Sequence, residues 1–223
     1  MQKINNFSNV EKIFSEEYGL QQSIELKIPI DINGKALPLY SYPAIEYIKS
    51  LDFSNKEIFE FGAGHSTLFW SQIAKKVTSV ENNQIWVEKL ADKANKLDNC
   101  HINFKQNDDY INFILANNKK YDVIIVDGNE NRLKCAKNAI KSIKDDGLII
   151  LDNADWFPNS AKLIRDNLNF IQFDFYGFRP SKSNTSVTSF FVSRKSDLAP
   201  LNSNKHPNYA IGGRKKQSFN DKI

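Results

Sequence analysis

Short apolar runs alternate along this chain with longer segments whose apolar residues recur at helical spacing. Each run has the length of a β-strand, and turn-forming residues bound the runs. The predicted strands cover residues 57–61, 77–80, 102–104, 121–126 and 148–151. The last two of these runs are apolar on both faces, which predicts that they are central strands of a sheet.

The segments between the runs have helical patterns. One expected helix covers residues 66–74, and weaker patterns cover 109–115 and 159–168. Two further helices are indicated by apolar residues spaced three or four apart, namely Trp86, Leu90, Ala94 and Leu97, and then Leu133, Ala136, Ile140 and Ile143. Strand and helix in alternation predict a parallel sheet with helices on both faces.

The pattern changes after residue 168. Two strand-like runs, 170–178 and 185–194, follow each other with only the turn-rich stretch "RPSKSN" between them. Since no helix separates them, they should pair antiparallel. We therefore expect an α/β fold, a doubly wound, Rossmann-like sheet of seven mostly parallel strands whose last strand is antiparallel.

The two ends of the chain lie outside this pattern. We divide the chain into an aromatic-rich N-terminal extension or lid (1–50), the α/β domain (51–194) and a basic tail (195–223). The extension contains "PLYSYPAIEYIKS", with an expected helix at 44–50. This stretch can serve packing, cover a site as a lid, or form an oligomer contact, and the sequence leaves all three open.

Charge and composition add limits to this picture. The net charge of +4 over 223 residues comes from the tail, which holds six Lys/Arg and two Asp, so the first 194 residues are neutral. We interpret the tail, with Arg214, Lys215 and Lys216, as a solvated end and not a nucleic-acid arm. Two cysteines, no leader-like start and apolar runs too short to span a membrane favour a single-domain cytoplasmic protein.

The first predicted strand leads into the glycine-containing stretch "IFEFGAGHSTLFWSQ" (58–72). Gly62 and Gly64 allow the backbone to approach a ligand closely. A dinucleotide-binding loop would carry a third glycine where Thr67 stands. Glu60, just before the loop, would repel a phosphate but can accept hydrogen bonds from an ammonium group, which favours S-adenosylmethionine.

Further acids follow the next two strands. Glu81, in "VTSVEN", can bind both hydroxyls of a ribose, and Asp108, in "FKQNDDY", can reach an adenine amino group, with Asp109 as the competing choice. Asp108 can instead cap the following helix.

The ordered set "EFGAGHST", "SVE", "ND" and "YDVIIVDG" resembles the class I S-adenosylmethionine-dependent methyltransferases over residues 40–194. The resemblance implies that the first loop lines the methionine part of the cofactor, that the second acid binds the ribose and that the third reaches the adenine. The cofactor-binding set is then Glu60, Gly62, Ala63, Gly64, Ser66, Thr67, Glu81, Asn82, Asp108, Asp109 and Asp127. His65, in the same loop, is a candidate for orienting cofactor or substrate.

Oxygen ligands follow the fourth and fifth strands. Asp127 ends "YDVIIVD", and Asp152 and Asn153 lie in "ILDNAD", a set that suits a hard cation such as Mg²⁺. The set resembles the metal-dependent O-methyltransferases of the catechol and caffeoyl-coenzyme A type, which implies Asp127, Asp152 and Asn153 as metal ligands. Gly128 departs from that pattern, and no catalytic lysine can be assigned. Asp127 can instead be a general base unaided, and Asp127, Asp152 and His65 are the catalytic candidates.

These residues favour methylation of a hydroxyl on a small molecule or glycan precursor, with or without a divalent cation. "VDGN" stands where the amino-methylating enzymes of DNA carry an Asn/Asp-Pro-Pro-aromatic motif, so we do not expect a nucleic-acid substrate. No membrane partner is expected, and the oligomeric state stays open, with a homodimer as one option. The alternatives are an NAD-dependent oxidoreductase and a non-catalytic cofactor-binding module.

Overall fold

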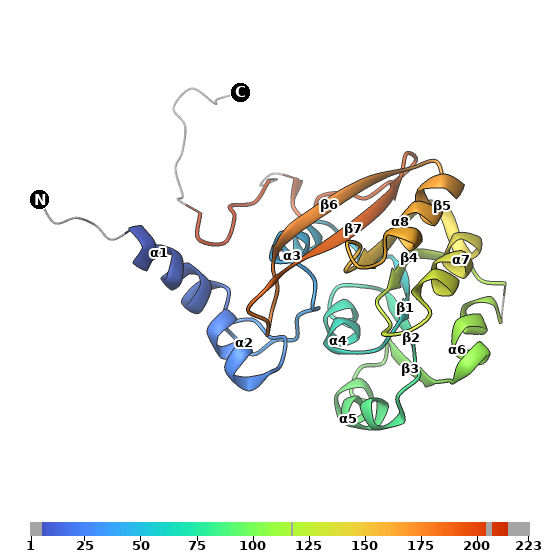
Figure 1. Ribbon diagram of the computed structural model, residues 1–223, viewed down its shortest axis with the longest axis horizontal. Helices are drawn as coiled ribbons and strands as arrows, with labels where there is room; N and C mark the ends of the chain where they lie inside the picture. The colour runs from blue at the N-terminus through green and yellow to red at the C-terminus, as the bar shows by residue number, and fades with distance from the viewer. Residues whose placement is uncertain (1–5, 117, 204–206, 214–223) are drawn as a thin grey trace, which may run out of the picture.

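A seven-stranded sheet forms the centre of the protein, in the order β3-β2-β1-β4-β5-β7-β6 (Figure 1). The computed structural model describes residues 6–116, 118–203 and 207–213, so the expected basic cluster at Arg214 lies outside the described residues. The strands are β1 Glu57–Phe61, β2 Lys76–Glu81, β3 Cys100–Phe104, β4 Tyr121–Val126, β5 Ile143–Asp152, β6 Phe170–Phe178 and β7 Thr185–Ser193.

Strand directions confirm the expected fold class. The five strands from β3 to β5 run parallel, while β7 is antiparallel to both β5 and β6. β4 and β5 are interior strands, as their apolar character predicts. Because β7 is antiparallel to both β5 and β6, β6 runs in the same direction as β5. The C-terminal end of β6 therefore lies at the same edge of the sheet as the C-terminal ends of β1, β4 and β5.

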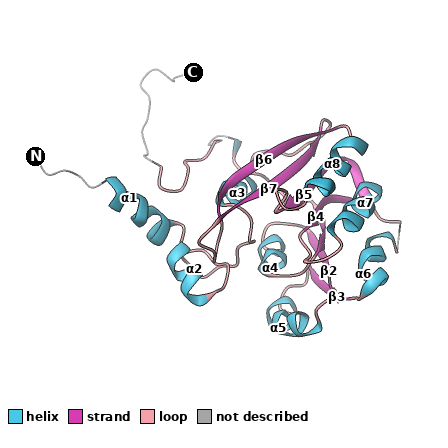
Figure 2. Ribbon diagram, in the orientation of Figure 1, coloured by secondary structure: helices cyan, strands magenta, loops and turns pink. Residues whose placement is uncertain are grey.

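Helices cover both faces of this sheet (Figure 2). These are α3 Tyr42–Lys49, α4 His65–Ser71, α5 Gln84–Ala94, α6 Asn107–Asn112, the 3₁₀ helix η2 Phe113–Leu115, α7 Arg132–Ser142 and α8 Pro158–Asn167. Before them, α1 Asn6–Lys12, the π-helix η1 Ile13–Glu17 and α2 Leu20–Leu26 lie to one side of the sheet (Figure 1). Within the described ranges, no helix is long and apolar enough to cross a bilayer.

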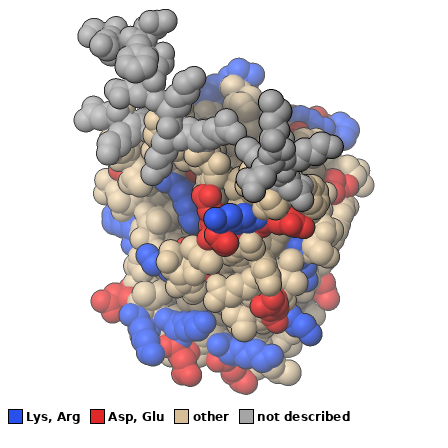
Figure 3. Space-filling view, turned by 90° about the vertical axis from the view of Figure 1, so that its left-hand side faces the viewer, with Lys and Arg blue, Asp and Glu red and all other residues tan. Residues whose placement is uncertain are grey.

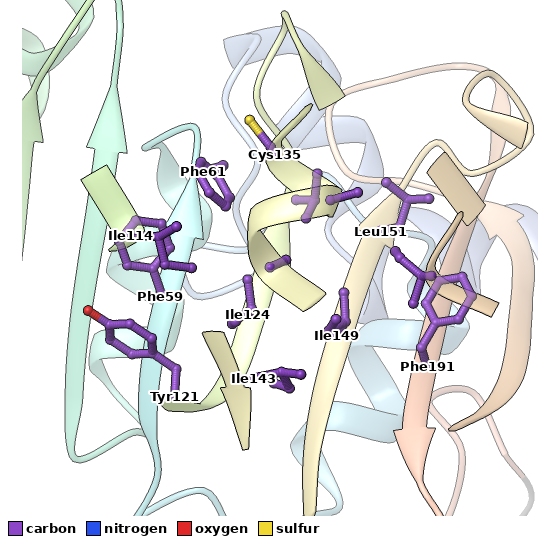
Figure 4. Packing of buried hydrophobic residues seen from close by; sticks show 14 of the residues in the cluster. Phe59, Phe61, Ile114, Tyr121, Ile124, Cys135, Ile143, Ile149, Leu151 and Phe191 are labelled. Atoms are coloured by element: carbon purple, nitrogen blue, oxygen red, sulfur yellow. The ribbon is translucent and has the colours of Figure 1, made fainter. Parts of the chain in front are cut away.

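One face of the sheet packs against α6, η2, α7 and α8. Alternate strand residues such as Phe59, Ile124, Ile149 and Phe191 point into this layer and meet helix residues such as Cys135 (Figure 4). These side chains are almost completely removed from water, so this layer supplies a large share of the hydrophobic stabilisation.

The opposite face packs against α3 and α4, and it draws on residues that precede β1. Tyr40, Ile45 and Ile48 are fully buried or nearly so against Trp70 and the strand residue Ile125. Of the three roles left open for this stretch, the structure therefore shows packing. The domain division at residue 51 stays a prediction, although part of the segment before it contributes to the core.

The junction between α7 and β5 differs from the pattern in the sequence. Ile143 has helical spacing with Ile140, but it begins β5 and pairs with Tyr121. Its side chain is buried in the same apolar layer as those of α7. This shared burial explains why the apolar spacing continues to Ile143 although the helix has ended. Gly147 follows, where a Cβ would lie 2.6 Å from the Ile143 side chain, and the strand register shifts between the pairs of Tyr121 and Val123.

Candidate active site

The turn from β1 into α4 contains the two glycines, and the structure gives them different roles. Gly62 has φ +90°, and a Cβ there would lie 2.8 Å from the backbone N and Cα of Gly128. Only glycine therefore allows the loops after β1 and β4 to approach this closely. Gly64 is extended, with φ −172°, and the nearest atom to a Cβ would be Ser66 Oγ at 3.6 Å. The protein itself leaves room there.

Glu60 is completely buried beneath this turn. Its Oε2 accepts hydrogen bonds from Ser79 Oγ, at 2.6 Å, and from the Thr67 hydroxyl. Its Oε1 is enclosed and makes no hydrogen bond of good geometry with the described residues, although the Ser66 hydroxyl lies close enough to lower the pKa of Glu60. Burial raises the pKa of Glu60 to about 7, against the opposing effect of the neighbouring hydroxyls. A buried acceptor without a donor is costly, so this oxygen marks a place for a ligand donor.

Thr67 links the acid to the loop. Its hydroxyl oxygen accepts a hydrogen bond from the Gly64 N–H at 3.0 Å while its proton is donated to Glu60. This is the position at which a dinucleotide-binding loop would have its third glycine. Ser66 and Thr67 are both buried in the first turn of α4.

Glu81, at the end of β2, holds the loop from the other side. Its Oε2 accepts from the Ala63 N–H at 2.9 Å, and its Oε1 accepts from the N–H groups of Asn82 and Asn83 at 2.9 and 2.8 Å. Burial raises the pKa of Glu81, and these three backbone bonds oppose that rise. Trp86 Nε1 donates to the Ala63 carbonyl at 2.7 Å. Since an ionised carboxylate has about four acceptor positions, Glu81 keeps capacity for a ligand hydroxyl.

Asp108, Asp109 and His65 lie at the margin of this arrangement. Both aspartates are exposed in the first turn of α6, so the structure does not choose between them. His65 begins α4, and its Nε2 is buried without a partner among the described residues. Burial lowers the pKa of His65, and the charge that adds to this effect is Lys93 of α5. The structure therefore places His65 on the α5 side and does not bring it together with the acids of β4 and β5.

Asp127, at the end of β4, is paired with Arg132 of α7. Arg132 Nη2 lies 2.9 Å from Asp127 Oδ1, and its other donors bond the carbonyls of Gly128, at 2.7 Å, and Asp152. Burial raises the pKa of Asp127, whereas the Arg132 charge lowers it. The Arg132 guanidinium lies 4.5 Å from the Phe157 ring centroid. Arg132 thus ties the ends of β4 and β5 together and neutralises Asp127.

Asp152 and Asn153, at the end of β5, are also held by protein groups. Asp152 Oδ1 accepts from Thr188 Oγ1 at 2.6 Å. With the Asn153 oxygen turned toward its donors, it accepts from Arg179 Nη1 at 3.0 Å and Ser186 Oγ at 2.8 Å. Burial, followed by the charge of Asp127, raises the pKa of Asp152 to about 8.

These contacts fit a divalent cation poorly. Asp127 is occupied by Arg132, Asp152 Oδ1 by Thr188 and the Asn153 oxygen by Arg179. Two guanidinium groups stand where a metal ligand set needs free oxygens. In the described part of the chain, no three His, Cys, Asp or Glu side chains gather as metal ligands either. The arrangement expected for a Mg²⁺ site is therefore replaced by ion pairing and hydrogen bonding.

Tyr40 and Arg179 are site residues that the pattern of acids did not indicate. Burial raises the pKa of Tyr40 well above its ordinary value, and the charges of Glu60, Asp127 and Asp152 add to the rise. The Tyr40 hydroxyl therefore lies in the field of all three acids. The aromatic stretch "PLYSYP" was the only signal for it in the sequence. Arg179 lies in the turn "RPSKSN", whose composition indicates a turn and nothing more.

The seven-stranded order, with its antiparallel β7, and the glycine turn after β1 define the Rossmann-like fold of the class I methyltransferases. No protein-family model matches the chain, and no curated protein matches it significantly.

Solved structures with this fold are similar to the chain. The fibrillarin pre-rRNA processing protein of Methanococcus jannaschii has a TM-score of 0.55 and 18% identity, covering 71% of this chain and 76% of its own. Precorrin-6y C5,15-methyltransferase of Geobacter metallireducens has a TM-score of 0.52 and 12% identity, covering 66% of this chain and 87% of its own. An rRNA methylase of Streptococcus thermophilus has a TM-score of 0.50 and 12% identity, covering 68% of this chain and 93% of its own. At these identities the likeness establishes the fold.

Proposed function

We propose that this protein transfers the methyl group of S-adenosylmethionine to a hydroxyl group of a small molecule or glycan precursor. The observation that carries the proposal is the unpartnered Oε1 of buried Glu60 under the glycine turn. The cofactor has an ammonium group that can donate to this oxygen and a positive charge that a carboxylate favours. The same carboxylate would repel a pyrophosphate.

The other loop residues fit the remainder of that cofactor. A Cβ at Gly64 would make only ordinary contacts with the protein, so a ligand can approach the backbone there, and Glu81 keeps acceptor capacity for a ribose hydroxyl. Asp108 and Asp109 lie exposed beyond β3, where either can reach an adenine amino group. When bound, S-adenosylmethionine supplies a methyl group activated by a sulfonium. These residues hold and orient it, which is a large part of what an in-line transfer needs.

Asp152 is the proposed proton acceptor for the hydroxyl nucleophile. A general base works best when its pKa lies near the working pH, and burial raises the pKa of Asp152 to about 8. Asp127 is neutralised by Arg132 and supports this role by keeping the end of β4 in place. The proposal includes no divalent cation, because the expected ligand oxygens are already engaged.

The kind of acceptor stays a prediction. Two of the similar structures are named for rRNA, so the expectation that nucleic acid is not the substrate remains to be tested. On the one face drawn in Figure 3, Lys and Arg side chains lie together with Asp and Glu side chains. The preference for a small acceptor therefore rests on the neutral charge of residues 1–194 and on the absence of the DNA amino-methylation motif from the sequence.

Calorimetric titration tests the cofactor assignment. S-adenosylmethionine should bind the wild type with micromolar affinity, and Glu60→Gln should weaken binding by about tenfold or more, because a hydrogen bond to a charged group contributes about 1.5–3 kcal/mol. Glu81→Ala should also weaken it. Glu88→Gln, which removes an exposed acid of α5, is the matched control and should bind like the wild type.

The same titrations separate the alternatives. Each is run with Mg²⁺ and with chelator, and NAD⁺ replaces S-adenosylmethionine in a parallel series. Affinity that does not depend on Mg²⁺ agrees with the engaged oxygens. Binding of NAD⁺ without binding of S-adenosylmethionine would move the assignment to an oxidoreductase. Cofactor binding without methyl transfer to any diol or sugar acceptor would indicate a non-catalytic module.

A further inference from the structure

Arg179 is a buried cation without a carboxylate partner. It is 7% exposed, and its Nε is enclosed and makes no hydrogen bond to the described residues. Among those residues, no acidic oxygen lies within 4 Å of its nitrogens, whereas Arg132 has such a contact with Asp127. A buried arginine without a carboxylate partner is unusual, because a buried charge without an ion pair is costly.

The geometry around Arg179 directs it toward the candidate active site. It follows β6 directly, and the C-terminal end of β6 lies at the same sheet edge as the ends of β4 and β5. Its Nη1 donates to Asn153 Oδ1 at 3.0 Å, next to Asp152 in sequence. Its guanidinium lies 5.5 Å from the ring centroid of Trp156, which is 60% exposed. Arg179 thus lies between the proposed base and an exposed aromatic ring.

The two acids at this edge form no direct ion pair with Arg179. Arg132 takes up the charge of Asp127. The charge of Arg179 lowers the pKa of both Asp127 and Asp152, but neither carboxylate lies within 4 Å of its nitrogens. Arg179 therefore keeps a donor, the enclosed Nε–H, that no group of the described residues accepts.

We propose that Arg179 binds an oxyanion, a carboxylate or a phosphate, carried by the methyl acceptor, while Trp156 covers the acceptor at the mouth of the site. This inference rests on the proposed methyltransferase function and adds the substrate class to it. The planar, forked guanidinium donors match both oxyanions, and the Nε–H is a donor that a ligand oxygen can satisfy.

The test uses three small probes on the full-length protein saturated with S-adenosylhomocysteine, namely acetate, inorganic phosphate and neutral acetamide. Binding is followed by NMR on the arginine Nε–H resonances at constant ionic strength. The Arg179 signal is assigned by its loss in Arg179→Gln. Arg194→Gln is the matched control, because Arg194 follows β7 at the other end of the same hairpin, is exposed and donates to Asn169.

We expect a saturable shift of the Arg179 signal with acetate or phosphate and none with acetamide. Arg179→Gln should weaken the favoured anion by about tenfold or more, Arg179→Lys should retain part of the affinity, and Arg194→Gln should leave it unchanged. The stronger of the two anions identifies the group on the acceptor. If Arg179→Gln does not fold, the wild-type comparison of anions with acetamide and the Arg179→Lys variant still decide.

Two results overturn the inference. Equal shifts with acetamide, or no saturable shift with either anion, would show that Arg179 is not an oxyanion site. Titration with S-adenosylhomocysteine alone distinguishes this failure from that of the proposed function. If the cofactor binds and no anion does, only the inference fails. If an anion binds and the cofactor does not, the methyltransferase proposal fails and the acceptor assignment falls with it.

Discussion

Replacing Gly62 by alanine tests the close contact between the loops after β1 and β4. The backbone at Gly62 has φ +90°, a region that an L-residue rarely adopts. The new Cβ would lie 2.8 Å from backbone atoms of Gly128, well inside the separation of about 3.5–4.0 Å that non-bonded carbons prefer. Both loops are anchored, since Gly62 N–H donates to the Val80 carbonyl at 2.8 Å and Asp127 N–H to the Phe61 carbonyl at 3.0 Å. The clash cannot be relieved by a side-chain rotation.

The expected cost follows from these two terms. A left-handed conformation costs an L-residue about 1–2 kcal/mol, and overpacking costs about 1–3 kcal/mol more. The sum of about 2–5 kcal/mol corresponds to a Tm lower by roughly 4–20 °C for a chain of this length. The clash at residue 62 should also displace the neighbouring Ala63, whose N–H and carbonyl bond Glu81 and Trp86. Cofactor affinity should therefore fall as well.

Gly64→Ala is the control that separates fold from ligand. Gly64 is extended and its Cβ would make an ordinary contact of 3.6 Å, so the Tm should fall by less than about 4 °C, the equivalent of about 1 kcal/mol at a helix N-cap. Affinity for S-adenosylmethionine should still fall by about tenfold, or about 1.4 kcal/mol. Calorimetry and thermal unfolding measure both effects. Equal Tm losses for the two variants, or an unchanged Tm for Gly62→Ala, would contradict a backbone clash at Gly62.

Three further outcomes are expected. Burial raises the pKa of Glu60 to about 7, and only the charged carboxylate attracts an ammonium group, so affinity for S-adenosylhomocysteine should fall roughly five- to tenfold from pH 7 to pH 6. An α-amine stays protonated over this range. In calorimetry, Glu60→Gln should remove the pH dependence, and a wild-type affinity that does not change with pH would contradict the expectation. Thr188→Val removes the hydroxyl that bonds Asp152 and should lower the free energy of unfolding by about 1–3 kcal/mol in urea titration, where an unchanged midpoint would count against that bond. Arg132→Met leaves the partly buried Asp127, which is 17% exposed, without its ion-pair partner, and should lower the free energy of unfolding by up to about 3–5 kcal/mol in the same assay. A loss below about 1 kcal/mol would show that the pair contributes little.

The sheet could be predicted from the sequence because strand burial leaves a direct pattern. The runs at 121–126 and 148–151 are apolar on both faces, and only interior strands of a covered sheet need that. The ends of helices were harder to predict from the sequence. Ile143 is an example, because a buried side chain at this position is compatible with the helical spacing before it and with the strand that it begins. The helices α1, η1 and α2 were not predicted. Phe7, Val10 and Ile24 remain exposed there, so burial leaves no clear pattern.

Acids beside the glycine loop could be proposed as site residues from the sequence because they end apolar strands, whereas contacts between distant elements could not be proposed. Glu60 and Glu81 lie at the loop that the glycines indicated. The expected metal ligands fit a cation poorly because two arginines contact their oxygens. Arg132 of α7 pairs with Asp127, and Arg179 of the β6–β7 turn donates to Asn153. Tyr40 enters the site from a segment before the sheet. No spacing in the chain records that such residues meet.

The most direct test of the central claim is a crystal structure of the protein with S-adenosylhomocysteine bound. We expect the amino nitrogen within hydrogen-bond distance of Glu60 Oε1, the adenosine running past Gly64 toward Glu81, and the sulfur facing the edge where Asp152 stands. A ligand bound elsewhere, or a bound molecule whose amino group leaves Glu60 Oε1 unpartnered, would contradict it.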